Sequence, residues 1–252
     1  MDREIERIDR TGFGDIVVIQ KKGFGYGVDS VLLAAFAAGE TGAAPVSTGS
    51  RIADLGTGCG IVAFALHHKL GRAKITGYDI RSGAIDCAGR ACRMNGLEDD
   101  IDFVCADIGD VVSHMGIEAG SFDAVVTNPP YFRRTPDEPG AADPDERYIA
   151  RHETTAGIDG FAAASASMLR AGGSLYMVHR PDRLADIFTA MRAAGIEPKD
   201  MQMVVPTVGK PANIVLIRGV KGAGSELKML PEIAVHTPDG EYTDEILKIY
   251  ER

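Results

Sequence analysis

Two short motifs contain residue types from which a ligand site could be built. The first, Asp54-Leu-Gly56-Thr57-Gly58-Cys-Gly60, follows an apolar run that predicts a strand and precedes a pattern that predicts a helix. Its glycines allow the backbone to turn tightly and to approach a ligand closely. The second motif, Asn128-Pro129-Pro130-Tyr131, follows another predicted strand. Ligands of open α/β sheets bind beyond the carboxyl ends of the strands, so both motifs are expected at one site.

The acidic residue ahead of the glycines favours a cationic ligand. Asp54 would repel a pyrophosphate, whereas it would attract the amino and sulfonium groups of S-adenosylmethionine. The last glycine also comes earlier than in the G-x-G-x-x-G pattern of dinucleotide sites. We therefore expect S-adenosylmethionine as the cofactor. Asp79, which ends the next predicted strand, is placed to accept from the ribose hydroxyls, and Asp107 from the adenine amino group; either could instead cap a helix.

The motif that begins with Asn128 suits the methylation of an exocyclic amine. Such a nitrogen is a poor nucleophile, because its lone pair is delocalised into the adjoining π-system. The Asn128 side-chain oxygen and the Pro129 carbonyl can each accept one N–H hydrogen bond, which would aim the nitrogen at the methyl group. Tyr131 can stack on a flipped-out base. The alternative interpretation of the motif is a simple strand-ending turn.

The elements that must position these motifs alternate along the chain. From Arg51 onward, short apolar runs alternate with helical patterns, which predicts βαβ units. We expect an α/β, Rossmann-like fold with a mostly parallel seven-stranded sheet that ends in an antiparallel strand, and with helices on both faces. The expected strands are 51–55, 74–79, 102–105, 122–127, 174–179, 201–205 and 213–218. The expected helices are 61–70, 82–95, a region near 110–115, 160–171 and 182–194, and Gly71, Gly96 and Gly172 fall where helix C-caps belong.

The remaining segments flank this core. Residues 1–50 are expected to form an N-terminal appendage with a strand at 15–20, a glycine-rich stretch and an apolar helix at 30–38. Residues 51–220 are expected to form the cofactor-binding core. Residues 221–252 are expected to form a C-terminal extension that packs on the core.

The bulk composition excludes several classes of protein. Hydrophobic residues make up 45% and charged residues 25% of the 252 residues, as in folded globular proteins. The net charge of -9 argues against indiscriminate nucleic-acid binding, which needs clustered Lys and Arg. The cysteines include no C-x-x-C pair, and His67 and His68 point to different faces of a helix, so buried reduced thiols and no metal are expected. No apolar stretch has transmembrane length, and we expect a cytoplasmic protein.

Together, the two motifs resemble those of class I Rossmann-fold methyltransferases that modify the amino nitrogen of adenine or glutamine. The segments 24–34 and 231–242 and the tetrad Ala150-Arg151-His152-Glu153 are similar to the bacterial tRNA1(Val) adenine-N6 methyltransferases. This resemblance implies a tRNA substrate, methylated on the adenine just 3′ of the anticodon. It implies a tetrad that organises the site wall, although an ion-pair cluster at a helix start is an equal alternative. It also implies cofactor contacts from Asp29, Asp54, Gly56, Thr57, Gly58, Gly60, Asp79, Ile80, Asp107 and Asn128, catalytic roles for Asn128, Pro129 and Tyr131, and substrate contacts from Tyr131, Arg133 and Arg134.

Two alternatives differ from this interpretation. A protein glutamine-N5 methyltransferase of the release-factor type shares the Asn-Pro-Pro-Tyr motif, but such enzymes carry a separate helical N-terminal domain, whereas a strand-like segment precedes the cofactor motif here. A non-catalytic binding module with the same fold would not need the acceptor motif. The short motifs specify neither the RNA and nucleotide that are modified nor the oligomeric state.

Overall fold

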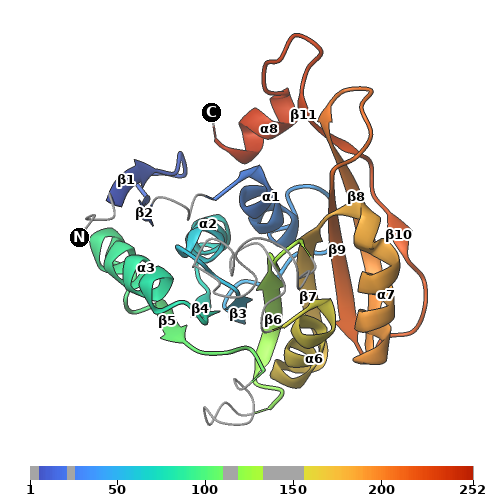
Figure 1. Cartoon of the computed structure of the whole chain (residues 1–252), viewed down its shortest axis with the longest axis horizontal. Coiled ribbons are helices and arrows are strands. Elements are labelled where there is room, and N and C mark those ends of the chain that lie inside the picture. Colours follow the sequence, from blue (N-terminus) through green and yellow to red (C-terminus); the bar gives the residue numbers. More distant parts are fainter. Residues whose placement is uncertain (1–5, 22–25, 110–118, 133–155, 252) are drawn as a thin grey trace, which may run out of the picture.

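A nine-stranded sheet forms the centre of the molecule, and the computed structural model describes residues 6–21, 26–109, 119–132 and 156–251. The sheet order is β10-β8-β9-β7-β6-β3-β4-β5, and β11 also pairs with β8 (Figure 1). The bounds are β3 (Arg51–Leu55), β4 (Lys74–Asp79), β5 (Ile101–Cys105), β6 (Phe122–Thr127), β7 (Leu169–His179), β8 (Ile196–Thr207), β9 (Ile214–Lys221), β10 (Lys228–Met229) and β11 (Ile233–His236).

The seven strands expected from the sequence are all present, and two short ones extend the sheet. β3, β4, β5, β6 and β7 are parallel to one another, while β9 is antiparallel to both β7 and β8. The reversed strand was expected at the end of the sheet, but it lies inside, because β9 pairs with β7 and leaves β8 on the outer side. β10 and β11 pair in parallel with β8. Segments of two and four residues are too short to show an alternating pattern.

Helices cover both faces of this sheet. α1 (Val28–Ala37), α2 (Ile61–Leu70) and α3 (Ser82–Asn95) contribute to one apolar core, and α6 (Ile158–Met168) and α7 (Leu184–Ala193) contribute to a second (Figure 1). α1 is apolar on all sides and buried from Ser30 to Ala37, because it packs against α2, β7 and the C-terminal α8 (Asp244–Ile249). A 3-10 turn, η1 (Pro181–Arg183), precedes α7.

The N-terminal segment forms a hairpin. β1 (Glu6–Arg10) pairs in antiparallel fashion with β2 (Val17–Lys21), which covers most of the strand expected at 15–20. Asn95, at the end of α3, fixes the hairpin: its Oδ1 accepts from the Val17 N–H at 2.9 Å, and its Nδ2 donates to the Val17 carbonyl at 2.8 Å. β1 was not expected, because four of its five residues are charged.

Helix ends agree with the sequence where glycine takes the left-handed conformation at the C-cap. Gly71 and Gly96 do so after α2 and α3. The expected cap at Gly172 is wrong, because α6 ends at Met168 and the next residue, Leu169, already pairs with Phe122 in the sheet. The helix expected near 110–115 lies outside the described residues. None of the described helices combines the length and the apolar character needed to cross a bilayer.

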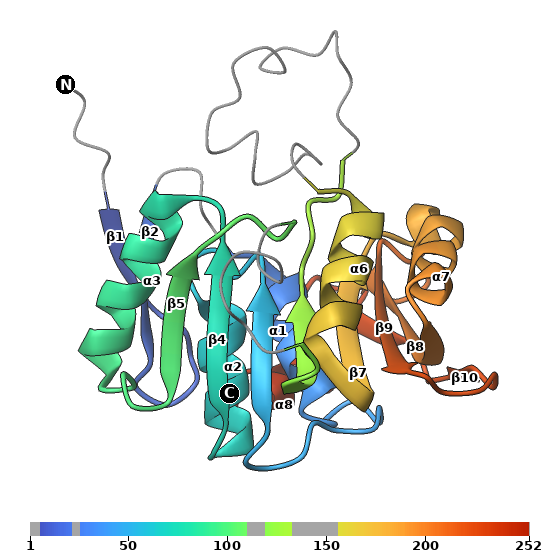
Figure 2. The same cartoon turned by 90° about the horizontal axis from the view of Figure 1, so that it is seen from below.

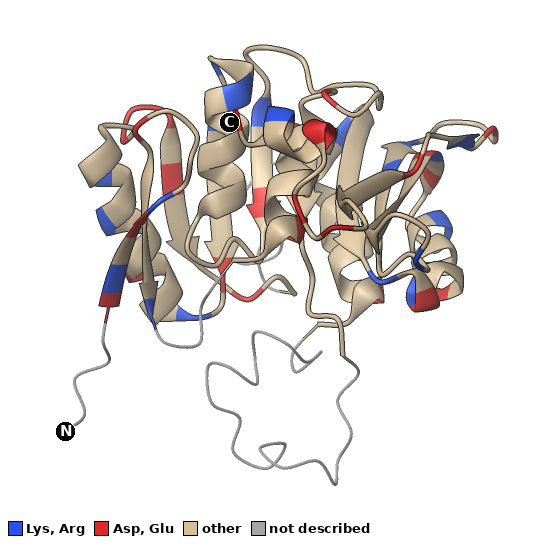
Figure 3. Ribbon diagram, turned by 90° about the horizontal axis from the view of Figure 1, so that it is seen from above, with Lys and Arg blue, Asp and Glu red and all other residues tan. Residues whose placement is uncertain are grey.

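The free cysteines differ in exposure. Cys59, Cys87 and Cys92 are buried, as expected, whereas Cys105 at the end of β5 is exposed. The expectation of burial fails for Cys105, which is the last residue of β5, a strand at the edge of the sheet. In the view of Figure 3, acidic and basic residues are interspersed over most of the described elements.

Candidate active site

The two motifs meet at the carboxyl ends of adjacent strands. β3 and β6 are parallel neighbours (Figure 2). In their register Leu55 lies opposite Thr127. The chain therefore leaves both strands at the same edge, where Gly56 and Asn128 follow. A Cβ atom added to Gly56 would lie 4.0 Å from the Asn128 carbonyl oxygen. The expectation of a single site is thus consistent with this geometry.

The glycine loop adopts the backbone conformation for which its glycines are needed. Gly56, Gly58 and Gly60 have φ values of +74°, +58° and +83°, which residues with a Cβ adopt rarely. At Gly60 a Cβ would also approach Phe103 within 2.7 Å. The loop therefore passes close to its surroundings and opens directly into α2, whose first residue is Ile61.

Asp54 is a carboxyl group held in an unfavourable environment for its charge. It is 1% exposed, and burial raises its pKa to about 7, with a further contribution from the negative charge of Asp79. The Thr57 hydroxyl donates to Asp54 Oδ2 at 2.6 Å and partly offsets this effect. A positively charged ligand at this loop would stabilise the ionised carboxylate. The residues therefore fit the ammonium and sulfonium groups of S-adenosylmethionine.

Asp79 already has partners on both carboxylate oxygens. Oδ1 accepts from the backbone N–H of Arg81 at 3.0 Å and from its Nε at 2.9 Å. Oδ2 accepts from the Gly58 N–H at 2.9 Å and from the other end of the same guanidinium at 2.7 Å. Asp79 thus bonds to the glycine loop, but both of its oxygens, which were expected to accept from ribose hydroxyls, already accept from Arg81, a residue that the sequence analysis did not single out.

The Asn128 side chain is oriented by the start of α1. Its Nδ2 donates to Ser30 Oγ at 3.1 Å and to Asp29 Oδ2 at 3.3 Å. An ionised carboxylate can only accept hydrogen bonds, so the amide nitrogen must face Asp29 and the amide oxygen must face away from it. The geometry leaves Asn128 Oδ1 without a donor among the described hydrogen bonds, as an acceptor for an incoming N–H.

Tyr131 completes this arrangement. Its hydroxyl donates to Asp29 Oδ2 at 2.6 Å, and burial together with the negative charge of Asp29 raises the tyrosine pKa well above its usual value. The Tyr131 ring lies 5.1 Å from the His179 ring, measured between centroids. Asp29 therefore holds both ends of the acceptor motif, whereas the resemblance had implied only that it contacts the cofactor.

The remaining predicted residues lie around the same edge or outside the description. Ile80 is 38% exposed beside Asp79, as an apolar surface at the rim. Asp107 Oδ1 accepts from the Gly109 N–H at 2.9 Å, which is a local turn contact, and the residues of the helix that it was expected to cap lie outside the described residues. Arg133, Arg134 and the tetrad 150–153 lie outside the described residues.

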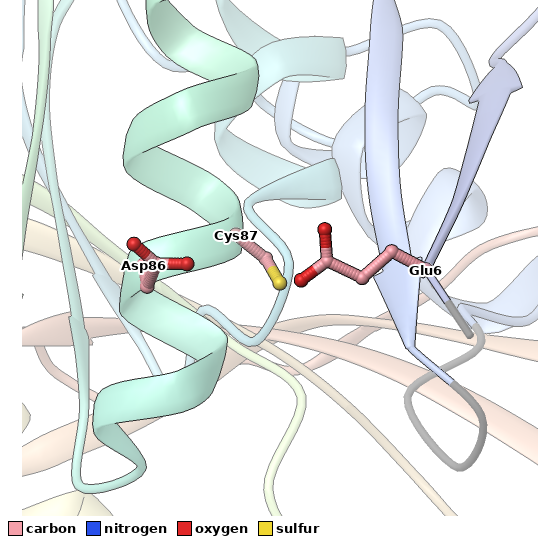
Figure 4. A group of neighbouring side chains, drawn as sticks. All are labelled: Glu6, Asp86 and Cys87. Atoms are coloured by element: carbon pink, nitrogen blue, oxygen red, sulfur yellow. The ribbon is translucent and has the colours of Figure 1, made fainter. Parts of the chain in front are cut away.

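One group of potential metal ligands occurs in the described part of the chain. Glu6, Asp86 and Cys87 bring their ligand atoms within 4.8 Å of one another between the hairpin and α3 (Figure 4). Arg90 already neutralises them: it donates to both Glu6 oxygens at 2.8 Å and lies 3.0 Å from an Asp86 oxygen. Burial raises the pKa of the Cys87 thiol, which disfavours the thiolate that a metal would need. We regard this cluster as an ion-pair contact.

The comparisons with known proteins agree with this geometry. Residues 30–143 match the sequence profile of the methyltransferase small domain. The match begins in α1 and extends past the acceptor motif, so it includes Asp54, Asp79 and Asn128. It supports the prediction of S-adenosylmethionine as cofactor, and it confirms the expected methyltransferase fold.

The curated relatives to which this chain is similar carry two different names. A tRNA1(Val) (adenine(37)-N6)-methyltransferase of Porphyromonas gingivalis is 31% identical over 161 residues, which are 64% of this chain and 60% of that protein. The chain thus matches less than two thirds of that relative's length. A protein of the same name from Bacteroides fragilis is 27% identical over 88% of this chain and 87% of its own. A release factor glutamine methyltransferase of Xylella fastidiosa is 32% identical over 58% of this chain and 52% of its own.

A solved structure shows the same fold. A predicted O-methyltransferase from Agrobacterium tumefaciens superposes with a TM-score of 0.69 over 88% of this chain and 95% of its own, at 20% identity. Sequence identity at this level supports a shared fold but gives no information about the substrate. The resemblance to tRNA adenine-N6 methyltransferases, inferred from the sequence, is confirmed by the names of the relatives.

Proposed function

We propose that this protein transfers a methyl group from S-adenosylmethionine to the exocyclic N6 of an adenine in tRNA. The orientation of the Asn128 amide carries the proposal. Its nitrogen is engaged by Ser30 and Asp29, so that its oxygen is left to accept from an amine. A simple strand-ending turn would not need such an anchor. The relatives named tRNA1(Val) adenine-N6 methyltransferases, one of which matches most of the chain, support adenine as the acceptor base.

The protein's part in the reaction is to bind and orient. Asn128 Oδ1 and the Pro129 carbonyl each accept one hydrogen bond from the amine, which turns the nitrogen lone pair toward the methyl group and stabilises the positive charge that develops on it. When bound, S-adenosylmethionine supplies a methyl group that its sulfonium centre already activates. The amine therefore needs no strong base, and its extra proton leaves after the bond has formed. Asp54 stabilises the positive end of the cofactor.

The tRNA substrate requires contacts beyond the acceptor motif. We assign phosphate or base contacts to Arg133 and Arg134, which follow Tyr131 in the sequence. Tyr131 offers part of its ring to a flipped-out base, since its hydroxyl is held by Asp29. We further propose a cytoplasmic location, which a role in tRNA modification supports.

Competition between two acceptors tests the substrate assignment. Purified protein and labelled S-adenosylmethionine are incubated with unmodified total tRNA, with a release-factor fragment that contains Gly-Gly-Gln, and with both together. We expect label in the tRNA, at a rate that the fragment does not reduce. Label in the fragment alone would assign the protein to the glutamine methyltransferases and refute the proposal, and label in neither would refute both acceptors.

A variant pair tests the role of Asn128. Asn128→Ala removes the amide oxygen, and we expect the rate of transfer to fall by about 10²–10³-fold, as for loss of one preorganised hydrogen-bonding group in other active sites. The Kd for S-adenosylmethionine should change less than about twofold. Ser30→Ala is the matched control, because it removes one partner of the same amide and leaves Asp29 in place. Equal loss of cofactor binding in Asn128→Ala would show that the site is misassigned.

A further inference from the structure

His179 is a buried polar residue behind the acceptor motif. It is the last residue of β7, the neighbour of β6, and it has no exposed surface. β6 and β7 are parallel with Thr127 opposite Met177, so His179 lies level with the residues that follow Thr127. Its ring centroid is 5.1 Å from that of Tyr131, at an interplanar angle of 58°. Neither motif of the sequence includes it.

The contacts of His179 define its tautomer. Nδ1 accepts the backbone N–H of Arg180 at 2.8 Å, so Nδ1 carries no proton. Burial, and then the positive charge of Arg183, lower the histidine pKa to about 4, which keeps the ring neutral near pH 7. The proton of the neutral ring must therefore reside on Nε2. Nε2 is thus a fixed N–H donor.

This donor belongs to a ring that lies beside the acceptor motif. Nε2 is buried and makes no hydrogen bond of good geometry with the described residues. Buried donors are rarely left without a hydrogen-bond acceptor, because the loss of their hydrogen bonds to water is unfavourable. The Pro130 backbone lies close enough to the ring to act on the histidine as a hydrogen-bond acceptor.

The prolines explain why one such bond would matter. Their rings fix φ at positions 129 and 130, so the main freedom that remains in the motif is the ψ rotation of these residues. A hydrogen bond to the Pro130 carbonyl fixes ψ of Pro130, and with it the direction in which the chain continues to Tyr131. The Pro129 carbonyl, which is the second acceptor for the amine, belongs to the peptide just before.

We propose that His179 is a positioning residue for the methyl-acceptor motif: its Nε2–H holds the Pro130 carbonyl, and its ring supports Tyr131. The proposal deepens the proposed function and rests on it for the kinetic effects, but the tautomer and the contact are properties of the protein alone. His179 touches neither the cofactor nor the amine. It acts through the backbone that presents the Pro129 carbonyl.

Two substitutions separate the donor from the ring. His179→Phe keeps an aromatic ring against Tyr131 and removes the donor. His179→Gln places an amide N–H near the position of Nε2 and removes the ring. We expect His179→Phe to lower kcat by about tenfold with little change in the Kd for S-adenosylmethionine, and His179→Gln to restore most of this loss. Circular dichroism of both variants checks that they fold.

The proposed tautomer of His179 can also be measured without an activity assay. Nitrogen-15 NMR of the wild-type protein should show a pyrrole-like Nε2 and a pyridine-like Nδ1 for His179 at neutral pH, with Nε2–H protected from exchange. A pyridine-like Nε2 would overturn the proposal whatever the substrate is. If the wild-type protein methylates tRNA, transfer by His179→Phe at the wild-type rate, or equal losses in His179→Phe and His179→Gln, would overturn the role of the donor. Absence of tRNA methylation by the wild-type protein would instead refute the proposed function and leave the NMR result to decide the tautomer.

Discussion

The buried carboxyl group of Asp54 should make the stability of the cofactor-free protein fall as pH rises. Its pKa is raised by burial from 3.8 to about 7. In the unfolded chain the group ionises near its ordinary pKa, so between about pH 4 and pH 7 the folded state binds a proton that the unfolded state does not. The contribution of Asp54 to stability must then decrease as pH rises through this window, and must level off above pH 7.

The size of this effect follows from the difference between the two pKa values. About three pKa units at 1.36 kcal/mol each correspond to about 4 kcal/mol. Asp54→Asn keeps the shape and an acceptor for the Thr57 hydroxyl but cannot ionise. The free energy of unfolding of Asp54→Asn relative to the wild type should therefore rise by as much as about 4 kcal/mol between pH 4 and pH 8, with all other titrating groups in common.

Urea unfolding of the two cofactor-free proteins at several pH values measures this difference. A difference that is constant across the pH range would refute the assignment of a raised pKa to Asp54. Binding of S-adenosylmethionine provides an independent check, because a cationic ligand favours the ionised carboxylate and should release a proton near pH 6. Calorimetry in buffers of different ionisation enthalpy should detect this release in the wild type and not in Asp54→Asn.

Two more substitutions test the cofactor loop. Arg81→Met removes the guanidinium that donates to both oxygens of Asp79, so we expect the cofactor-free protein to be less stable. Calorimetry should show about tenfold tighter binding of S-adenosylmethionine, because the ribose hydroxyls no longer compete with Arg81 for Asp79. Weaker binding would mean that Arg81 itself contacts the cofactor. Gly60→Ala would place a Cβ 2.7 Å from Phe103 at a φ of +83°, so it should lower the free energy of unfolding by about 2–5 kcal/mol. Gly49 has a φ of +80° and open space around it, so Gly49→Ala should lower the free energy of unfolding by only about 1–2 kcal/mol. Equal losses at the two glycines in denaturant unfolding would contradict the close approach of Phe103.

The sequence was sufficient to predict the helices and strands whose residues all follow one hydrophobic pattern. Each core strand is a short apolar run before a polar or glycine-rich turn, and α2 and α3 were predicted to the residue. The boundary between α6 and β7 was not, because Leu169 is equally suited to a helix or a strand until its pairing with Phe122 decides. The two short strands beside β8 depend on a sheet edge that only the folded molecule provides.

The sequence predicted the residues of the site that belong to short motifs. The glycine loop and the acceptor motif carry local signals, and their meeting followed from the rule for parallel strands. The side chains that orient these two motifs carry no local sequence signal. Ser30 bonds to Asn128 across 98 residues, and His179 reaches Tyr131 from another strand. Arg81 could have been noticed, since a cation two residues after Asp79 is close enough to pair with it.

Identification of the methylated nucleoside tests the central claim most directly. Unmodified tRNA is treated with the protein and S-adenosylmethionine that carries a carbon-13 methyl group, then digested to nucleosides and analysed by mass spectrometry. The account predicts labelled N6-methyladenosine from the wild-type protein and almost none from Asn128→Ala under the same conditions. A labelled methyl group on a ring nitrogen or on ribose, or equal yields of N6-methyladenosine from the two proteins, would contradict it.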